Sequence, residues 1–213
     1  MSNTNGYNTL TKSMNGIITL ADGNGTVIED GTITTGELST QTLDASKKYL
    51  IKGIVTVPDG AVLSIPAGTV LVGQKSTKGT LVVKPGGKLV AEGTATKPIV
   101  FTSNQNAGER EQGDWGGLVI LGKANINQNN PAVEGISPAV NYGTFNSTAN
   151  DNDNSGILKY VRIEYAGVPF ATNNEINALT MGGVGSGTTL EYIQVYRSGD
   201  DAFEWFGGTV NCK

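Results

Sequence analysis

Short apolar runs separated by turn residues are the dominant pattern of this chain. From residue 49 onward, "YLIKGIVTVPDG", "AVLSIPAGTVLVG", "GTLVVKPGGKLVAEGT" and "KPIVFTS" follow one another, and each run closes on a turn rich in Pro and Gly. Partial alternation of apolar and polar residues predicts β-strands, and the Pro and Gly residues between them predict tight turns. The side chains expected to point inward are Ile51, Val55, Val57, Leu63, Ile65, Val70, Leu81, Val83, Leu89, Ile99 and Phe101.

A two-part repeat occupies the second half of the chain. The segment "LKYVRIEYAG" (158–167) aligns without gaps with "LEYIQVYRSG" (190–199), 32 residues later, and "ALTM-GG" (178–183) aligns with "AFEWFGG" (202–208). A period of this length without a helical pattern is typical of stacked β units, in which each repeat covers the apolar face of its neighbour. The sequence therefore predicts an all-β fold, a parallel β-helix or solenoid. A β-sandwich with chance similarity is the alternative.

Two regions fall outside this regular pattern. Residues 1–48 are expected to form an N-terminal cap or the first coils, and "GELSTQTLDASKKY" (36–49) is a candidate short helix. Residues 49–213 are the predicted β-helix, with a loop insertion at about 103–156 that holds one clear strand, 118–121. Loops of this length are usually functional or mobile. We expect this long loop to protrude from the stack and to form the wall of a groove.

Composition and charge narrow the chemistry. The chain has 213 residues, 30 of them Gly, with 16% charged residues and a formal net charge of -4. It has no cluster of basic residues that would indicate a nucleic-acid binder, and no apolar run long enough for a membrane span. There is no His, and Cys212 is the only Cys. Catalysis by Ser–His or Cys–His pairs is thereby excluded, which leaves carboxylates, Lys, Arg, Tyr or a hard metal ion.

The strand motifs resemble those of a known group of proteins. The run 49–103, together with "GDWGGLVILGKANIN", "YVRIEYAG" and "SGDDAFEWFGGTVN", is similar to secreted bacterial right-handed parallel β-helix surface proteins and lipoproteins. The resemblance implies a right-handed β-helix at the cell surface or outside the cell, with this sequence as a mature form without its signal peptide. It also implies a truncated portion whose open C-terminal coil would allow self-association. It says little about activity, because β-helices host many functions.

The segment "YRSGDDAFEWFGG" (196–208) is the first candidate site. Two adjacent carboxylates on a β-helix are typical of polygalacturonase-type hydrolases, but those enzymes also need a His. A calcium-dependent lyase remains an alternative, and its catalytic residues would be Arg197, Asp200, Asp201 and Glu204. The competing interpretation is that the aspartates bind turn amides and the arginine makes an ordinary surface contact. Alternation places Phe203 and Trp205 in the core and Glu204 on the outer face beside Thr180.

Two further motifs lie in or next to the long loop. "DNDNSG" (151–156) reproduces the first half of a calcium loop, with oxygen ligands at Asp151, Asp153 and Ser155, but it lacks the acidic residue that an EF-hand requires at its twelfth position. A looser calcium site or a solvated turn are both open. Tyr142 and Phe145 are candidate exposed aromatics for ligand binding, because no periodic pattern buries them. Trp115 is expected in the core.

These observations favour a non-catalytic β-helix scaffold at the cell surface that binds a glycan or a protein partner. The sequence leans against an enzyme, and any cofactor would be calcium. The calcium-dependent polysaccharide lyase is the first alternative. A structural β-solenoid that self-associates through its C-terminal coil is the second.

Overall fold

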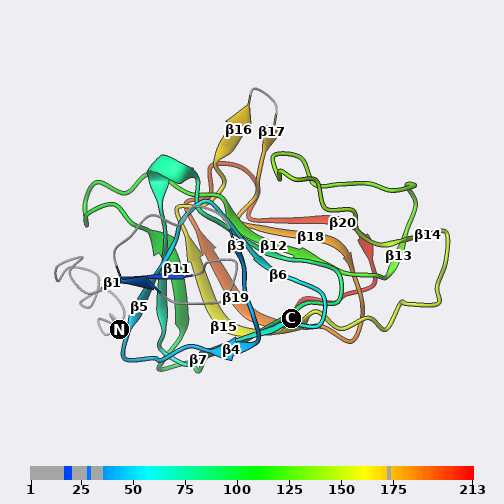
Figure 1. Cartoon of the computed structure of the whole chain (residues 1–213), viewed down its shortest axis with the longest axis horizontal. Coiled ribbons are helices and arrows are strands. Elements are labelled where there is room, and N and C mark those ends of the chain that lie inside the picture. The colour runs from blue at the N-terminus through cyan, green and yellow to red at the C-terminus, as the bar shows by residue number, and fades with distance from the viewer. Residues whose placement is uncertain (1–16, 21–27, 30–35, 172–173) are drawn as a thin grey trace.

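The computed structural model describes residues 17–20, 28–29, 36–171 and 174–213 as a parallel β-solenoid (Figure 1). Its strands stack in three faces, named A, B and C here. Face A holds β4 (Gln41–Thr42), β7 (Val62–Pro66), β10 (Lys88–Glu92) and the first parts of β15 (Gly156–Glu164) and β19 (Thr189–Tyr196). Face B holds β1 (Ile17–Leu20), β5 (Lys48–Ile51), β8 (Val70–Gly73), β11 (Ile99–Ser103) and the remainders of β15 and β19. Face C holds β3 (Gly36–Glu37), β6 (Ile54–Val57), β9 (Thr80–Val83), β12 (Gly117–Leu121), β18 (Leu179–Val184) and β20 (Phe203–Gly208).

All neighbouring strands within these faces pair in parallel, so the predicted fold class is confirmed. Faces A and B belong to one ten-stranded sheet, because β15 and β19 run through both, and face C is a separate six-stranded sheet. The remaining elements are β2 (Ile28–Glu29), which pairs antiparallel with β1, the short pairs β13 (Asn125–Ile126) with β14 (Thr144–Phe145) and β16 (Pro169–Ala171) with β17 (Asn174–Glu175), and a 3₁₀ helix, η1 (Lys75–Thr77).

The core runs along the axis of the solenoid. Every member of the predicted inward set lies in the main apolar cluster except Val70. Strand β8 is buried along its whole length, so alternation within it is ambiguous, and the structure turns Leu71 inward. Val70 instead joins Val72 and Val100 in a small buried cluster on face B. The prediction for Val70 was therefore wrong by one residue of register, which moves a side chain to the opposite face.

The two-part repeat is the register of the last coils. Leu158 lies opposite Leu190 and Val161 opposite Ile193 in the ladder between β15 and β19. The second part places Leu179 opposite Phe203 in the ladder between β18 and β20. Because the two copies have the same spacing, similar side chains stack on one another, as expected for repeats that cover one another.

The segment 36–49 is not helical. It forms β3 and β4, which pair in parallel with β6 and β7, so these residues already belong to the first coils. A turn follows, in which the Asp44 carboxylate accepts hydrogen bonds from the amide and the hydroxyl of Ser46, at 2.9 and 2.7 Å. The helix prediction was wrong because pairing with neighbouring strands overrides local preference. Most of the predicted cap, residues 1–16, 21–27 and 30–35, lies outside the described residues.

The long loop consists of two excursions around β12, a regular strand of face C. The second excursion extends beside β12, β18 and β20 (Figure 1). Its apolar residues pack on outward side chains of face C, in a second cluster formed by Val82, Val119, Leu121, Ile126, Val133, Ile136, Tyr142 and Ile176. Part of the loop is therefore a cover for face C. Burial of apolar surface gives it a fixed place against the sheet.

Candidate functional site

The bend between faces A and B carries a stacked pair of tyrosines. The backbone of Tyr160 in β15 and of Tyr192 in β19 adopts the left-handed conformation, with φ of 51° and 54°. This conformation is uncommon for residues other than Gly and turns each strand from one face to the next. The two rings are 4.6 Å apart and inclined by only 8°. That separation is close to the strand spacing of about 4.8 Å, so the rings continue the stacking of the coils. Tyr192 keeps 58% of its surface exposed.

A recess of about 260 Å³ lies beside this pair. The two tyrosines line it together with the turn that joins β10 to β11 and with outward residues of face B. Arg162 and Gln194 stand opposite each other in the ladder between β15 and β19. The full lining is Thr94, Ala95, Pro98, Tyr160, Val161, Arg162, Tyr192 and Gln194. Ligand pockets usually measure about 300–1,000 Å³, so this recess suits a single ring of a longer molecule. We call it the tyrosine recess.

The ionic groups at the tyrosine recess are paired. The Arg162 guanidinium lies 2.8 Å from Glu164, whose carboxylate is buried and also accepts a hydrogen bond from the Thr102 hydroxyl at 3.1 Å. On face A, the Lys159 ammonium lies 3.4 Å from the Glu191 carboxylate. The surface beside the tyrosines thus offers apolar ring faces, an amide and hydroxyl groups, and the charges of Arg162 and Lys159 there are paired with carboxylates.

In the acidic segment 196–208, the four residues predicted for a calcium-dependent lyase make separate contacts. Arg197 lies over the Tyr196 ring, 5.8 Å from its centre. None of the ion pairs within the described residues involves Arg197, Asp200 or Asp201. The Asn177 side chain accepts a hydrogen bond from the Asp201 amide at 3.0 Å and donates one to the Glu204 carboxylate.

The environment of Glu204 is nevertheless unusual for a carboxylate. Glu204 stands beside Thr180 on the outer side of face C, as its place in the repeat predicts. Burial raises the pKa of Glu204, and the charges of Asp200, Asp201 and Glu134 raise it further, while the hydrogen bond from Asn177 lowers it. The group is thus a partly buried acid held by an amide.

The predicted exposed aromatics behave differently from each other. Phe145, in β14, is 46% exposed, whereas Tyr142 is only 7% exposed and packs in the cluster over face C, with its ring 6.3 Å from that of Phe206. The expectation that Tyr142 is exposed was wrong, because a loop without periodicity can still fold its apolar residues against a sheet. Trp205 lies opposite the buried Met181 but is 47% exposed, so its predicted place in the core was wrong. Strand β20 is the edge strand of face C, so no further strand of that sheet stacks on its inward side chains. Trp115 is fully buried, as expected.

The two aspartates of the "DNDNSG" segment bind the chain itself. The Asp151 carboxylate accepts a hydrogen bond from the Asn125 amide, and the Asp153 carboxylate accepts one from the Lys123 amide, each at 3.0 Å. Ser155 is buried. In the part of the chain that the structure describes, no three Asp, Glu, Cys or His side chains are grouped as metal ligands require. The two aspartates fasten the corner after β12 to the start of β15.

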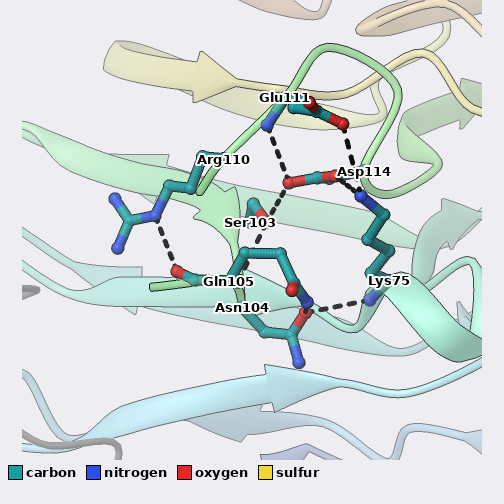
Figure 2. A network of polar contacts seen from close by, with 7 residues as sticks. All are labelled: Lys75, Ser103, Asn104, Gln105, Arg110, Glu111 and Asp114. Carbon is teal, nitrogen blue, oxygen red and sulfur yellow. Dashed lines mark hydrogen bonds and ion pairs between the residues drawn. The ribbon is translucent and has the colours of Figure 1, made fainter. Parts of the chain in front are cut away.

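A further polar network, which the sequence did not reveal, fixes the first excursion of the long loop (Figure 2). Its centre is the buried carboxylate of Asp114, which accepts hydrogen bonds from the Ser103 hydroxyl at 2.6 Å and the Glu111 amide at 3.1 Å. The Lys75 ammonium lies 2.7 Å from the same carboxylate. This ion pair raises the pKa of Lys75. The network continues through Asn104, Gln105 and Arg110.

The tyrosine recess is also absent from the candidates found in sequence. The alignment of Tyr160 with Tyr192 is visible in the sequence, but by itself it indicates only the register of the repeat. The available signal was a large aromatic repeated at an outward position, where a buried role does not explain it. The recess itself depends on the turn at 94–98, which only the folded chain brings beside the tyrosines.

Stacked parallel strands around an apolar interior, with side chains in register from coil to coil, define the chain as a β-helix protein. Residues 31–213 match the model of the pectate-lyase-like β-helix domain family, and the chain belongs to this family. No curated protein and no solved structure matches the chain significantly. Within the described residues, no helix has the length and apolar character needed to cross a membrane.

Proposed function

We propose that this chain is a non-catalytic β-helix that binds a glycan at the tyrosine recess, outside the cell or at its surface. The observation that carries the proposal is the stacked pair of Tyr160 and Tyr192, of which the second is largely exposed, beside a recess of the size of one sugar ring. The flat apolar face of an aromatic ring packs on the C–H groups of a sugar, while its hydroxyl group remains free to form hydrogen bonds.

Membership of the pectate-lyase-like family supports a ligand of carbohydrate type. The arrangement of Arg197, Asp200, Asp201 and Glu204 supports binding without chemistry. A lyase needs a base and a group that stabilises developing negative charge close to one substrate atom. Arg197 instead packs on Tyr196, and Glu204 is held by Asn177.

The test compares two aromatic substitutions by affinity gel electrophoresis and isothermal titration on a panel of soluble polysaccharides. Tyr192→Ala should weaken binding by about tenfold or more, because it removes the exposed ring. Phe145→Ala is the matched control, since Phe145 is also exposed but lies on β14, away from the recess lining. Binding that survives Tyr192→Ala but is lost in Phe145→Ala would place the site on the long loop and refute the proposal. Release of unsaturated product by the unaltered chain would contradict the non-catalytic role.

A further inference from the structure

If the tyrosine recess binds a glycan, as proposed above, the charges around it determine which class of glycan it accepts. Arg162 is the one charged side chain in the lining of the recess. Its guanidinium lies 2.8 Å from Glu164, and that carboxylate is buried, with the Thr102 hydroxyl as a further donor. The positive charge at the recess therefore has a fixed partner within the protein.

The neighbouring positions on face A are also balanced. Glu92, Lys159 and Glu191 stand in line on successive strands of β10, β15 and β19. Lys159 lies 3.4 Å from Glu191 and is flanked on its other side by Glu92 in the ladder. This line carries two negative charges and one positive charge, so it does not attract an anion. Lys97, on the turn beside the recess, adds a single exposed cation.

A sugar carboxylate would have to compete for Arg162 with a partner that cannot leave. Moving the guanidinium to a ligand would leave the buried Glu164 carboxylate without its counter-charge, and a buried unpaired charge is strongly unfavourable. An uncharged sugar makes no such demand. It needs only hydroxyl and amide partners, which the tyrosine hydroxyls, Thr94 and Gln194 supply, and an apolar ring face, which the tyrosines supply.

We infer that the tyrosine recess accepts an uncharged glycan and discriminates against polyuronates. The ion pair between Arg162 and Glu164 holds the arginine side chain along face B and neutralises its charge. The family is pectate-lyase-like, but apart from Lys97 the cations beside this recess are paired with carboxylates, whereas an acidic polysaccharide requires several free cations.

The experiment measures binding of the full chain to xyloglucan, to mixed-linkage β-glucan and to polygalacturonate, at low and at physiological ionic strength. We expect binding to at least one neutral polymer that depends on Tyr192 and changes by less than about twofold with salt, since no charge pairing is involved. Binding to polygalacturonate should be weaker by about tenfold or more.

A second variant tests the role of the buried carboxylate. Glu164→Gln keeps the shape of the side chain and an acceptor for Thr102 but frees the Arg162 charge, and should increase affinity for polygalacturonate in a salt-dependent manner. Retained binding to the neutral polymer reports that the variant is folded. Tyr192-dependent binding that is tighter for polygalacturonate in the unaltered chain would overturn this inference and leave the proposed function standing. Absence of Tyr192-dependent binding to all three polymers would overturn both.

Discussion

Replacing Asp114 with Ala should destabilise the chain measurably, although this residue lies in a loop. Its carboxylate is only 1% exposed and accepts hydrogen bonds from Ser103, at 2.6 Å, and from the Glu111 amide, at 3.1 Å. The Ser103 hydroxyl is itself fully buried. Without Asp114 this hydroxyl has no acceptor, and a buried unsatisfied polar group costs about 1–3 kcal/mol. Glu111 is an exposed residue, so its amide can bind water instead, and its hydrogen bond adds little to the loss.

Urea unfolding followed by Trp fluorescence provides the assay, because Trp115 is adjacent in sequence and fully buried. With a slope of about 2 kcal/mol per molar urea, the expected loss lowers the midpoint by about 0.5–1.5 M. Asp114→Asn retains an acceptor for Ser103 and should lose less. Lys75→Met removes the ion-pair partner, which is 45% exposed, but the Asp114 carboxylate keeps its hydrogen bonds from Ser103 and the Glu111 amide. This variant should therefore lose less than Asp114→Ala does.

The order of the unfolding midpoints of the three variants shows whether the buried hydroxyl or the ion pair provides the stabilisation. If Lys75→Met lowers the midpoint as much as Asp114→Ala does, the stabilisation comes from the ion pair at the surface, and the argument from the buried hydroxyl is refuted. The raised pKa of Lys75 predicts a matching pH dependence. The contribution of this pair is fully present below the unfolded pKa of the lysine and is lost as pH rises through its higher folded pKa, so only alkaline solution removes it.

Three other outcomes can be checked on the same protein. Gly73→Ala should lower the free energy of unfolding by about 1–3 kcal/mol and alter the near-UV circular dichroism, because the new methyl group would lie 2.5 Å from the Trp115 ring. An unchanged spectrum and an unchanged unfolding midpoint would contradict this packing. Glu204→Gln should raise the melting temperature at neutral pH. Because the folded pKa of Glu204 is raised, its contribution to stability is fully present below the unfolded pKa and is lost as pH rises through the folded pKa, and the uncharged amide avoids that loss. An unchanged dependence of the melting temperature on pH would count against the effect of burial. Excess EGTA should leave the melting temperature unchanged, because Asp151 and Asp153 already accept backbone amides, whereas a clear decrease would support a calcium site at 151–155.

The architecture of the solenoid could be predicted from the sequence. Alternating apolar residues, Pro- and Gly-rich turns and the 32-residue repeat are local or periodic features, and each coil of a solenoid contacts only its neighbours. The register of β15 with β19 could therefore be read directly from the aligned residues. There were two exceptions. At Val70, an unbroken apolar strand gave no alternation from which to choose a face. The segment 36–49, a candidate helix from the sequence, forms strands that pair with neighbouring coils.

Which side chains are available for function could not be predicted, because it depends on contacts between distant segments. Tyr142 is buried because a loop without any periodic pattern folds over face C, and Asp114 collects donors from segments that are separate in sequence. The tyrosine recess likewise needs the turn at 94–98 beside strands some 60 and 100 residues further on. Periodicity specifies the neighbours within a ladder, but the packing of a long loop and the pairing of charges depend on contacts between distant residues, which follow no repeat.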